Sequence, residues 1–435
     1  MKKLCVMGLG YIGLPTAVIF AKHGFNVHGV DINPSVINKL KNKELHIEEH
    51  GLKEMLIEVI ETGRLTFSTE PVKADAFIIA VPTPINKDKT ANLNYVKTAT
   101  EMIVPNLEKG NLVILESTVP PRTVEHIMIP ILKKSGLSIG DELFVSHSPE
   151  RVLPGRIIEE LILNDRIVGG INEKSSQLTA ELYQIFVTGK IHITDATTAE
   201  MVKLMENIYR DVNIALANEF ARIAERVGFN VWEAIELANQ HPRVNLHMPG
   251  PGVGGHCIAV DPWFVIEHAP EESKLISLAR KINDSTPFHV ANVIEKYVKD
   301  IEKPIISLLG LAFKGNVNDI RESPSLKVIE LLRKKGFQLK IYDPYINQHI
   351  EGKVNDVKEV AKGSDLLVIL TDHHIFKEID FKMIKGLMRR QVVFDTRHIL
   401  NKGQLESAGY HYIELGSPLS MYNCDKQICF SLIDH

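Results

Sequence analysis

The chain has 435 residues, of which 44% are hydrophobic and 24% charged, and its formal net charge is −4 from 50 basic and 54 acidic residues. This length and composition are typical of a globular protein with two or three domains of roughly 150 residues each. The near balance of charges gives no electrostatic reason to expect nucleic acid or an acidic membrane surface as a partner.

The N-terminal region and the cysteine content indicate a cytoplasmic protein. An apolar run follows Lys2 and Lys3 as in a signal peptide, but glycines interrupt the run and no small-residue cleavage site follows it. No segment approaches the ~20 apolar residues that span a bilayer. Four cysteines are too few to cross-link a chain of this length, which favours a reducing compartment.

The first 31 residues predict a dinucleotide-binding unit. A buried strand over residues 3–7 is followed by a glycine turn, a helix to about Lys22 and a second strand from Phe25 to Asp31. The three glycines allow a tight turn, close approach of a pyrophosphate and close packing of helix on strand. Asp31 has the spacing of the carboxylate that binds an adenosine ribose, and with no arginine beside it we expect NAD rather than NADP. The predicted cofactor-binding residues here are Gly8, Gly10, Tyr11, Ile12, Gly13 and Asp31.

Polar residues follow three further predicted strands. The strands cover residues 76–81, 112–115 and 143–146, and a helix is expected over residues 52–62. Because ligands bind beyond the carboxyl ends of strands in open parallel sheets, Thr83, Ser117 and Thr118 are expected on the nicotinamide side of the cofactor. Glu150 falls on the same edge. For an isolated threonine, a turn or capping role is an equally ordinary interpretation.

One long helix is predicted from about Asp195 to Gly228. Thr197 to Glu200 has the pattern of a capping box, and apolar residues then recur at helical spacing. Such a helix suits a spine between two domains, with a subunit interface along it. Lys203 and Asn207 lie one turn apart beside the apolar stripe, where a lysine commonly only covers the core. The stripe comprises Met201, Leu204, Met205, Ile208, Val212, Ala215 and Leu216.

The stretch from Pro249 to Trp263 surrounds Cys257 with glycines and places Asp261 four residues later. A thiol between flexible backbone and a carboxylate suits a covalent catalyst, because the thiolate is the nucleophile. A glycine-rich turn around a buried cysteine is the alternative interpretation.

After helical sequence to about residue 300, the strand and helix alternation resumes. Strands are predicted over residues 304–309, 338–342, 365–370 and 391–395, and a helix over residues 325–335. The two ends of the chain therefore look like similar nucleotide-binding folds. The second end lacks a GxGxxG motif, so we expect it to bind a different nucleotide, with Lys314, Arg321 and Arg397 as candidate phosphate or ribose contacts.

We therefore predict an α/β fold in which two Rossmann-like, doubly wound parallel sheets are joined by a helical domain with a long central helix. The predicted domains are an NAD-binding domain over residues 1–195, a helical domain with the cysteine loop over residues 196–300, and a nucleotide-sugar-binding domain over residues 301–435.

With these motifs, the chain resembles the UDP-glucose/GDP-mannose dehydrogenase family from about residue 3 to residue 420. The motifs are GLGYIGLP at the start, STVPPRT at 117, SPERVLPG at 148, EMVKLMENIYRDVNIALANE at 200, GPGVGGHCIAVDP at 250 and LAFKGNVNDIRESP at 311. The resemblance implies oxidation of the C6 alcohol of a nucleotide sugar to a carboxylate with two NAD molecules.

The resemblance also implies roles for single residues. Cys257 would form the covalent adduct, Lys203 and Asn207 would stabilise oxyanion charge, Asp261 and Thr118 would orient water, and Glu150 would be a base. Arg321 would face NAD. The substrate contacts would be Glu150, Arg151, Val152, Lys203, Asn207, Arg210, Arg243, His247, Gly254, Lys314 and Arg397, with Arg243 reaching a neighbouring subunit. We therefore expect a homodimer or a higher homo-oligomer.

The residues around the thiol bear on the substrate. His256, Pro154 and the HPRVN run at 241 resemble the members that act on N-acetylated hexosamines, and AVDPW most resembles those that oxidise UDP-N-acetyl-D-mannosamine. Members acting on UDP-glucose have a second glutamate at the position of Pro154. UDP-N-acetylglucosamine and, less favoured, UDP-glucose remain alternative substrates. A two-electron hydroxyacid-type dehydrogenase and a non-catalytic NAD sensor are the alternatives from other classes.

No metal is expected. Cys424 and Cys429 have a C-x₄-C spacing, but no second ligand pair lies near them in the sequence.

Overall fold

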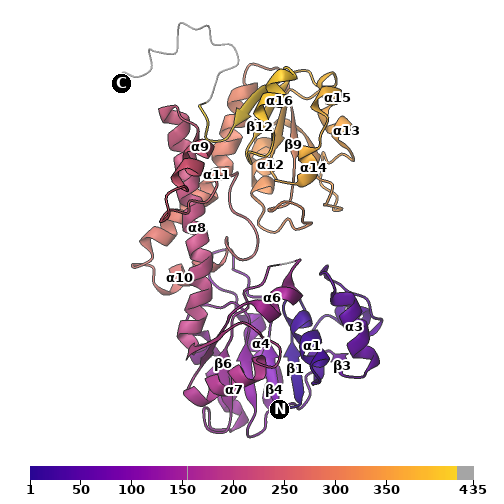
Figure 1. Ribbon diagram of the computed structural model, residues 1–435, viewed down its shortest axis with the longest axis vertical. Helices are drawn as coiled ribbons and strands as arrows, with labels where there is room; N and C mark the ends of the chain where they lie inside the picture. Colours follow the sequence, from indigo (N-terminus) through magenta and orange to yellow (C-terminus); the bar gives the residue numbers. More distant parts are fainter. Residues whose placement is uncertain (154, 419–435) are drawn as a thin grey trace. The chain divides into compact units, whose positions relative to one another are not determined.

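The computed structural model describes residues 1–153 and 155–418 (Figure 1). The chain forms two compact units, of which the first comprises Met1–Asn207 and Trp263–Glu272 and the second comprises Ile208–Pro262 and the chain from Ser273 onward. The long helix α8, Ala196–Val227, begins in the first unit and continues into the second.

The first unit is built on an eight-stranded sheet with the order β3-β2-β1-β4-β5-β6-β7-β8. The six strands from β3 to β6 are parallel, and the order reverses between β1 and β4. β7 runs antiparallel to β6, so the sheet is not parallel throughout as predicted. The strands are β1 (Lys3–Met7), β2 (Asn26–Val30), β3 (Leu65–Ser68), β4 (Ala76–Ile79), β5 (Leu112–Leu115), β6 (Phe144–His147), β7 (Arg166–Gly170) and β8 (Ile191–Asp195).

Helices cover both faces of this sheet, because successive side chains of each strand point to opposite sides. Leu4 and Val6 of β1 belong to one apolar cluster, whereas Cys5 and Met7 belong to another. The helices are α1 (Gly13–Lys22), α2 (Pro34–Lys41), α3 (Leu52–Glu61), α4 (Asn94–Ile103), α5 (Ile129–Leu132), α6 (Ile157–Leu163), α7 (Glu173–Tyr183) and α10 (Asp261–His268), of which α10 lies in this unit from Trp263 onward.

The second unit contains a fully parallel five-stranded sheet with the order β10-β9-β11-β12-β13. This order reverses between β9 and β11, as in other doubly wound folds. The strands are β9 (Ile305–Leu309), β10 (Gln338–Tyr342), β11 (Leu366–Ile369), β12 (Val392–Asp395) and β13 (His411–Glu414). The helices, besides α8, are α9 (Val231–Ala238), α11 (Lys274–Val298), α12 (Pro324–Lys334), α13 (Val357–Ala361), α14 (His374–Lys377), α15 (Phe381–Lys385) and α16 (Lys402–Ser407).

These two sheets confirm the predicted doubly wound α/β fold. The expected strands and helices occur within one or two residues of their predicted bounds, but β3, β7, β8 and β13 were not predicted. The first three residues of β8, Ile191 to Ile193, are half-buried or exposed, so this strand lacks the buried apolar run that marks the central strands.

One expectation about α8, the capping box at Thr197, was wrong. Asp195, rather than a threonine, caps the helix, since its carboxylate accepts hydrogen bonds from the Thr198 N–H (2.9 Å) and hydroxyl (2.6 Å). Glu200 accepts instead from the N–H groups of Arg122 and Val124, so no capping box forms. In the predicted apolar stripe, Leu204 and Ala215 are buried, whereas Met205 and Leu216 are exposed.

Candidate active site

The turn between β1 and α1 has the geometry that a dinucleotide requires. Gly8 has φ +90°, and a Cβ there would lie 2.5 Å from the Ala80 carbonyl oxygen. A Cβ at Gly13 would lie 1.9 Å from the Gly8 oxygen, whereas nothing lies within 4 Å of the equivalent position at Gly10. No side chain caps the N-terminus of α1. The open side at Gly10 and the uncapped helix therefore fit a pyrophosphate.

Asp31 follows β2 and lies over this turn. Its Oδ2 accepts from the Leu9 N–H (3.1 Å) and its Oδ1 accepts from the Asn33 N–H (2.9 Å). A carboxylate has about four acceptor positions, so two hydrogen bonds leave capacity for ribose hydroxyls. Tyr11 is exposed and Ile12 is half-buried beside it.

The ends of β4 and β5 are tied together on the predicted nicotinamide side. The Thr83 hydroxyl donates to the Thr118 carbonyl oxygen (2.6 Å), and the Ser117 hydroxyl donates to the Val81 oxygen (2.7 Å) while accepting from the Val81 N–H (2.9 Å). Thr83 and Ser117 thus have structural partners within the protein. Thr118 is half-buried and lies at the same edge of the sheet.

Glu150 belongs to a buried charge network. Arg166 donates from Nη1 to Glu150 Oε2 (2.9 Å) and from Nη2 to Glu116 Oε1 (2.6 Å), and it lies 3.7 Å from the ring centroid of Tyr183. Burial raises the pKa of Glu116, even though Arg166 opposes this effect. Sequence analysis missed Arg166, Glu116 and Tyr183. The only signal was a charged residue at the edge of an apolar strand, at positions 116 and 166.

Arg151 connects the Glu150 segment to α8. Its Nη1 lies 2.7 Å from Glu206 Oε1. Glu206 adjoins Asn207, which is 5% exposed, and Lys203 lies half-buried one turn earlier. The structure therefore brings the segment from Glu150 to Val152 to the part of α8 that carries Lys203 and Asn207. Val152 packs against the apolar cluster of the first unit.

In the second unit, the cysteine loop packs on the segment that follows β9. A Cβ at Gly254 would lie 2.7 Å from the Glu322 oxygen, and one at Gly255 would lie 2.9 Å from the Phe313 ring. The Gly255 N–H donates to the Arg321 oxygen (2.9 Å). These two glycines are therefore required for packing within the protein.

Cys257 is half-buried and is not part of a disulfide among the residues that the structure describes. Its carbonyl oxygen accepts from the Val260 N–H (3.0 Å) and the Asp261 N–H (2.8 Å), and this turn leads directly into α10. Asp261, the first residue of α10, is 3% exposed.

The three predicted nucleotide contacts of the second unit, Lys314, Arg397 and Arg321, differ in their burial and in their partners. Lys314 is exposed, and Arg397 is half-buried with Nε donating to the Leu370 oxygen (3.1 Å). Arg397 Nη2 also lies 3.5 Å from the Phe313 oxygen, so the structure brings it to the segment that carries Lys314. Burial lowers the pKa of Arg397. Arg321 is exposed and pairs with Asp319, 2.6 Å from Nη2 to Oδ2.

Two of the substrate contacts predicted in the helical region, Arg210 and His247, lie near each other. The ring of His247 packs against the ring of Tyr209, with centroids 5.9 Å apart. Burial and the positive charge of the nearby Arg210 lower the pKa of His247. Arg243 is exposed in the turn that precedes the cysteine loop, and its N–H lies 3.4 Å from His241 Nδ1.

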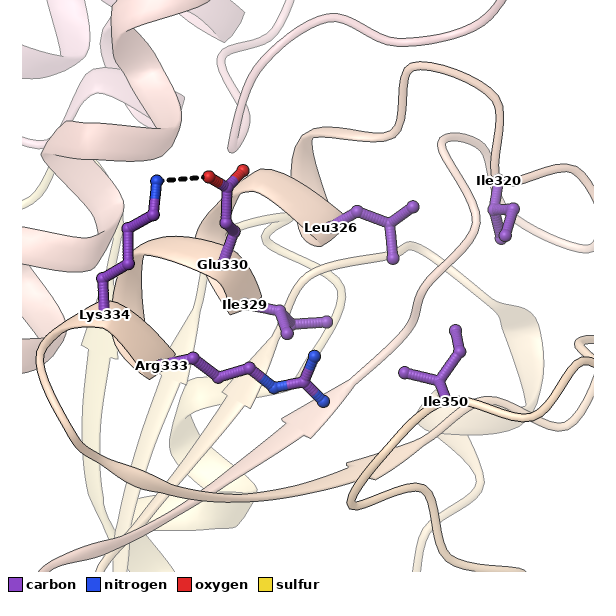
Figure 2. A pocket seen from close by; sticks show the side chains of 7 residues that line it. All are labelled: Ile320, Leu326, Ile329, Glu330, Arg333, Lys334 and Ile350. Carbon is purple, nitrogen blue, oxygen red and sulfur yellow. Dashed lines mark hydrogen bonds and ion pairs between the residues drawn. The ribbon is translucent and has the colours of Figure 1, made fainter.

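A pocket of ≈ 450 Å³ also lies in the second unit (Figure 2). None of the predicted site residues lines it. Glu330 and Lys334 form an ion pair (2.5 Å) at its edge. The lining residues are Ile320, Leu326, Ile329, Glu330, Arg333, Lys334 and Ile350.

Within residues 1–153 and 155–418, no three His, Cys, Asp or Glu side chains form a group that could hold a metal ion. No helix among the same residues is long and apolar enough to cross a membrane. Cys424 and Cys429, as well as Pro154, lie outside the described residues.

Three family models match successive parts of the chain. They are the NAD binding domain (residues 2–187), the central domain (197–285) and the UDP binding domain (307–402) of the UDP-glucose/GDP-mannose dehydrogenase family. Together they cover most of the sequence, and the cofactor is NAD, as predicted.

Individual relatives agree with this match. UDP-N-acetyl-D-mannosamine dehydrogenase of Methanocaldococcus jannaschii is 50% identical, with 95% of this chain and 96% of the relative covered. NDP-N-acetyl-D-galactosaminuronic acid dehydrogenase of Ralstonia solanacearum is 42% identical, with 91% and 96% covered. The solved UDP-D-ManNAc dehydrogenase of Pyrococcus horikoshii has a TM-score of 0.90 and 42% identity, with 95% of this chain and 99% of that one covered. The chain therefore belongs to the UDP-glucose/GDP-mannose dehydrogenase family and is an NAD-dependent UDP-sugar dehydrogenase.

Proposed function

We propose that this enzyme oxidises the C6 hydroxyl of UDP-N-acetyl-D-mannosamine to the carboxylate of UDP-N-acetyl-D-mannosaminuronate. The observation that carries the proposal is the half-buried thiol of Cys257 in a glycine loop, packed on the half of the protein that matches a UDP binding domain. The similarity to UDP-N-acetyl-D-mannosamine dehydrogenases supports the choice of sugar.

Both oxidations act on C6, but this carbon is tetrahedral in the alcohol and trigonal in the aldehyde. Bound NAD supplies the hydride acceptor, once for the alcohol and once for the aldehyde level. An aldehyde carbon is trigonal, and the Cys257 sulfur converts it into a tetrahedral thiohemiacetal by forming a C–S bond. Loss of hydride from that carbon leaves a thioester on Cys257. Water then breaks the C–S bond, which releases the carboxylate and regenerates the thiol.

Lys203 and Asn207 are the proposed stabilisers of the oxyanion that develops on C6 in these steps. The ammonium group and the side-chain amide are hydrogen-bond donors, and both sit on a rigid helix that fixes their spacing. We propose that Asp261 and Thr118 orient water and that Lys203 also transfers a proton.

Glu150 remains the candidate base. Arg166 holds one of its oxygens, which fixes the position of the carboxylate and reduces its freedom to act as a base. Because Pro154 stands where UDP-glucose enzymes have a second glutamate, hydrolysis would depend on fewer carboxylates than in those enzymes.

The proposed cofactor contacts are the glycine turn from Gly8 to Gly13, Asp31, the residues at the ends of β4 and β5 (Thr83, Ser117 and Thr118), and Arg321. For the substrate we propose the segment from Glu150 to Val152, Arg210, His247, Gly254, Lys314 and Arg397, with Arg243 contributed by a neighbouring subunit. This last assignment rests on a homodimer or larger homo-oligomer, which we propose from the exposed apolar side chains along α8.

The test is the stoichiometry of NADH formed per sugar consumed, on a panel of UDP-N-acetylmannosamine, UDP-N-acetylglucosamine, UDP-N-acetylgalactosamine, UDP-glucose and GDP-mannose. We expect two NADH per sugar, with kcat/KM highest for UDP-N-acetylmannosamine. Highest activity on UDP-N-acetylglucosamine, UDP-N-acetylgalactosamine or UDP-glucose would refute the substrate. One NADH per sugar would support the two-electron alternative instead.

The Cys257→Ser variant tests the covalent step in the same assay. Serine keeps the size of the side chain but is a far weaker nucleophile, so we expect turnover to fall by at least about 10³-fold while NAD still binds. Multiple turnovers at the wild-type rate in this variant would refute the thioester mechanism.

A further inference from the structure

The carboxyl ends of β9, β10 and β11 hold a buried polar cluster that none of the proposed site residues explains. Asp343 follows β10, and His373 follows β11. Both side chains are fully buried. The cluster surrounds the segment from Gly310 to Asn316, which carries Lys314 and Phe313.

Asp343 holds the first part of this segment. Its Oδ2 accepts from the Leu311 N–H (2.6 Å), the Ala312 N–H (3.1 Å) and His373 Nε2 (3.0 Å). Its Oδ1 accepts from the Tyr345 N–H (2.9 Å). Burial favours the neutral acid, but the hydrogen bonds outweigh burial and the pKa of Asp343 lies below its ordinary value.

Asp31 has the corresponding place in the first half, where its Oδ2 accepts from the Leu9 N–H. Asp31 accepts two hydrogen bonds from the protein and is partly exposed, whereas Asp343 accepts four and is buried. Asp343 therefore has no capacity left for a ribose. The same carboxylate position binds cofactor in one half and supports the backbone in the other.

His373 holds the far end of the segment. The Asn316 N–H donates to His373 Nδ1 (2.8 Å), so Nδ1 is an acceptor and the proton of the neutral ring is on Nε2, which faces Asp343. The ring is stacked on Tyr345, with centroids 4.7 Å apart, and Phe376 contacts its edge. One imidazole is thus hydrogen-bonded both to Asp343, which holds the backbone before Lys314, and to Asn316, which follows Lys314.

The segment between these points has little freedom to move. The Thr371 hydroxyl donates to the Ala312 oxygen (2.7 Å), and a Cβ at Gly315 would lie 2.4 Å from the Asp372 oxygen. Asn316 has φ +60°, and its Oδ1 accepts from the His374 N–H (2.9 Å). Phe313 in turn supports Gly254 and Gly255 of the cysteine loop.

We propose that His373 is a positioning residue for the UDP-sugar. It holds the Gly310–Asn316 segment directly at Asn316 and, through Asp343, at Leu311 and Ala312, so that Lys314 meets the diphosphate. The inference rests on the proposed role of Lys314. It predicts that breaking the His373 hydrogen bonds weakens binding of UDP and leaves binding of NAD unchanged.

The experiment measures the affinity of the full-length enzyme for UDP and, separately, for NAD by calorimetry. His373→Phe keeps an aromatic ring between Tyr345 and Phe376 but removes both hydrogen bonds, and we expect its Kd for UDP to rise about tenfold. NAD affinity within twofold of wild type would show that the first half is intact. The matched control, His374→Phe, changes the adjacent exposed histidine and should leave the UDP affinity unchanged.

Two smaller substitutions divide the hydrogen bonds and keep the test decisive if His373→Phe does not fold. His373→Asn retains an acceptor near the position of Nδ1, and His373→Gln retains a donor near the position of Nε2. Because the Asn316 bond holds the segment directly, His373→Asn should bind UDP more tightly than His373→Gln. Wild-type UDP affinity in both variants, or an equal loss of UDP and NAD binding, would refute the positioning role.

The Lys314→Ala variant separates this inference from the one on which it rests. If Lys314→Ala binds UDP as wild type does, the role of Lys314 is refuted. If Lys314→Ala weakens UDP binding and the His373 variants do not, the role of Lys314 stands and that of His373 is refuted.

Discussion

We propose that the choice of cofactor depends on one residue, Asp31. The Leu9 and Asn33 N–H groups hold its carboxylate over the glycine turn, so its orientation is set before any ligand binds. A fixed carboxylate accepts hydrogen bonds from ribose hydroxyls and repels the extra phosphate of NADP. On this proposal, the negative charge of one side chain contributes both affinity for NAD and discrimination against NADP.

Asp31→Asn tests this assignment. The amide keeps one acceptor oxygen but loses the charge, so we expect KM for NAD to rise about tenfold, which corresponds to ~1.4 kcal/mol. The preference for NAD over NADP should narrow because the repulsion of the 2′-phosphate is removed. Steady-state kinetics with both cofactors measure the change, and an unaltered Kd for UDP is the control. An unchanged KM for NAD would mean that Asp31 does not contact the ribose.

At this scale, sequence analysis succeeded where a residue acts through its local spacing and failed where it acts through a distant partner. The glycine turn and Asp31 lie within 24 residues of one another, and their pattern is readable as one motif. Glu116, Arg166 and Tyr183 meet only in the folded state, 50 and 67 residues apart from the glutamate. Pairings of this kind leave no periodic signal in a single sequence.

Among the elements, α8 shows which features of a helix its own sequence determines. Its length and its end before Gly228 were predicted, because apolar residues recur without interruption and Gly228 has φ +97°. Its start was predicted within one residue, but its capping residue was not, since Asp195 rather than Thr197 caps the helix. Glu200 is consequently available to hold the segment after β5, where Thr118 lies.

Glu200 makes the stability of this contact depend on pH. Burial is the main cause that raises its pKa from 4.5 to about 7, against two backbone hydrogen bonds that lower it. Between these two values the folded state binds more protons than the unfolded state, so this group's contribution becomes less favourable as pH rises. The stabilisation that is present below pH 4.5 is lost once the pH exceeds the folded pKa, and this loss is on the order of 1–3 kcal/mol.

Glu200→Gln should abolish that dependence. We expect the difference in unfolding free energy, wild type minus variant, to be larger at pH 5 than at pH 8, as measured by denaturant unfolding at both values. Glu125→Gln alters a nearby, exposed glutamate that pairs with Arg122 and serves as the matched control. A difference that grows with rising pH would show that Glu200 is ionised and stabilising in the folded protein.

Considered as a whole, the chain repeats one architecture with two functions. The doubly wound fold and the use of the carboxyl ends of its strands were predictable, because buried strands and helices alternate along the chain. The antiparallel junction of β6 and β7 was not, since parallel and antiparallel neighbours have the same apolar pattern when both faces are covered. How the cysteine loop is supported was likewise unpredictable, because Phe313 lies far along the chain from Gly254.

The surface of α8 carries the last prediction, on assembly. Apolar residues spaced three or four apart follow one side of the helix over roughly 27 Å, and four of them are exposed: Tyr209 (51%), Leu216 (37%), Ile223 (42%) and Val227 (71%), with Val212 and Phe220 between them. Water contact over such a stripe is unfavourable, and a second copy of the chain would remove it.

Ile223→Asp should therefore lower the mass measured by sedimentation or light scattering, whereas Lys281→Asp, at an exposed polar position of α11, should not. Because Arg243 is proposed to reach the sugar of a neighbouring subunit, Ile223→Asp should also raise KM for the UDP-sugar more than KM for NAD. A wild-type enzyme that is monomeric at assay concentrations and fully active would contradict both the interface and the shared site.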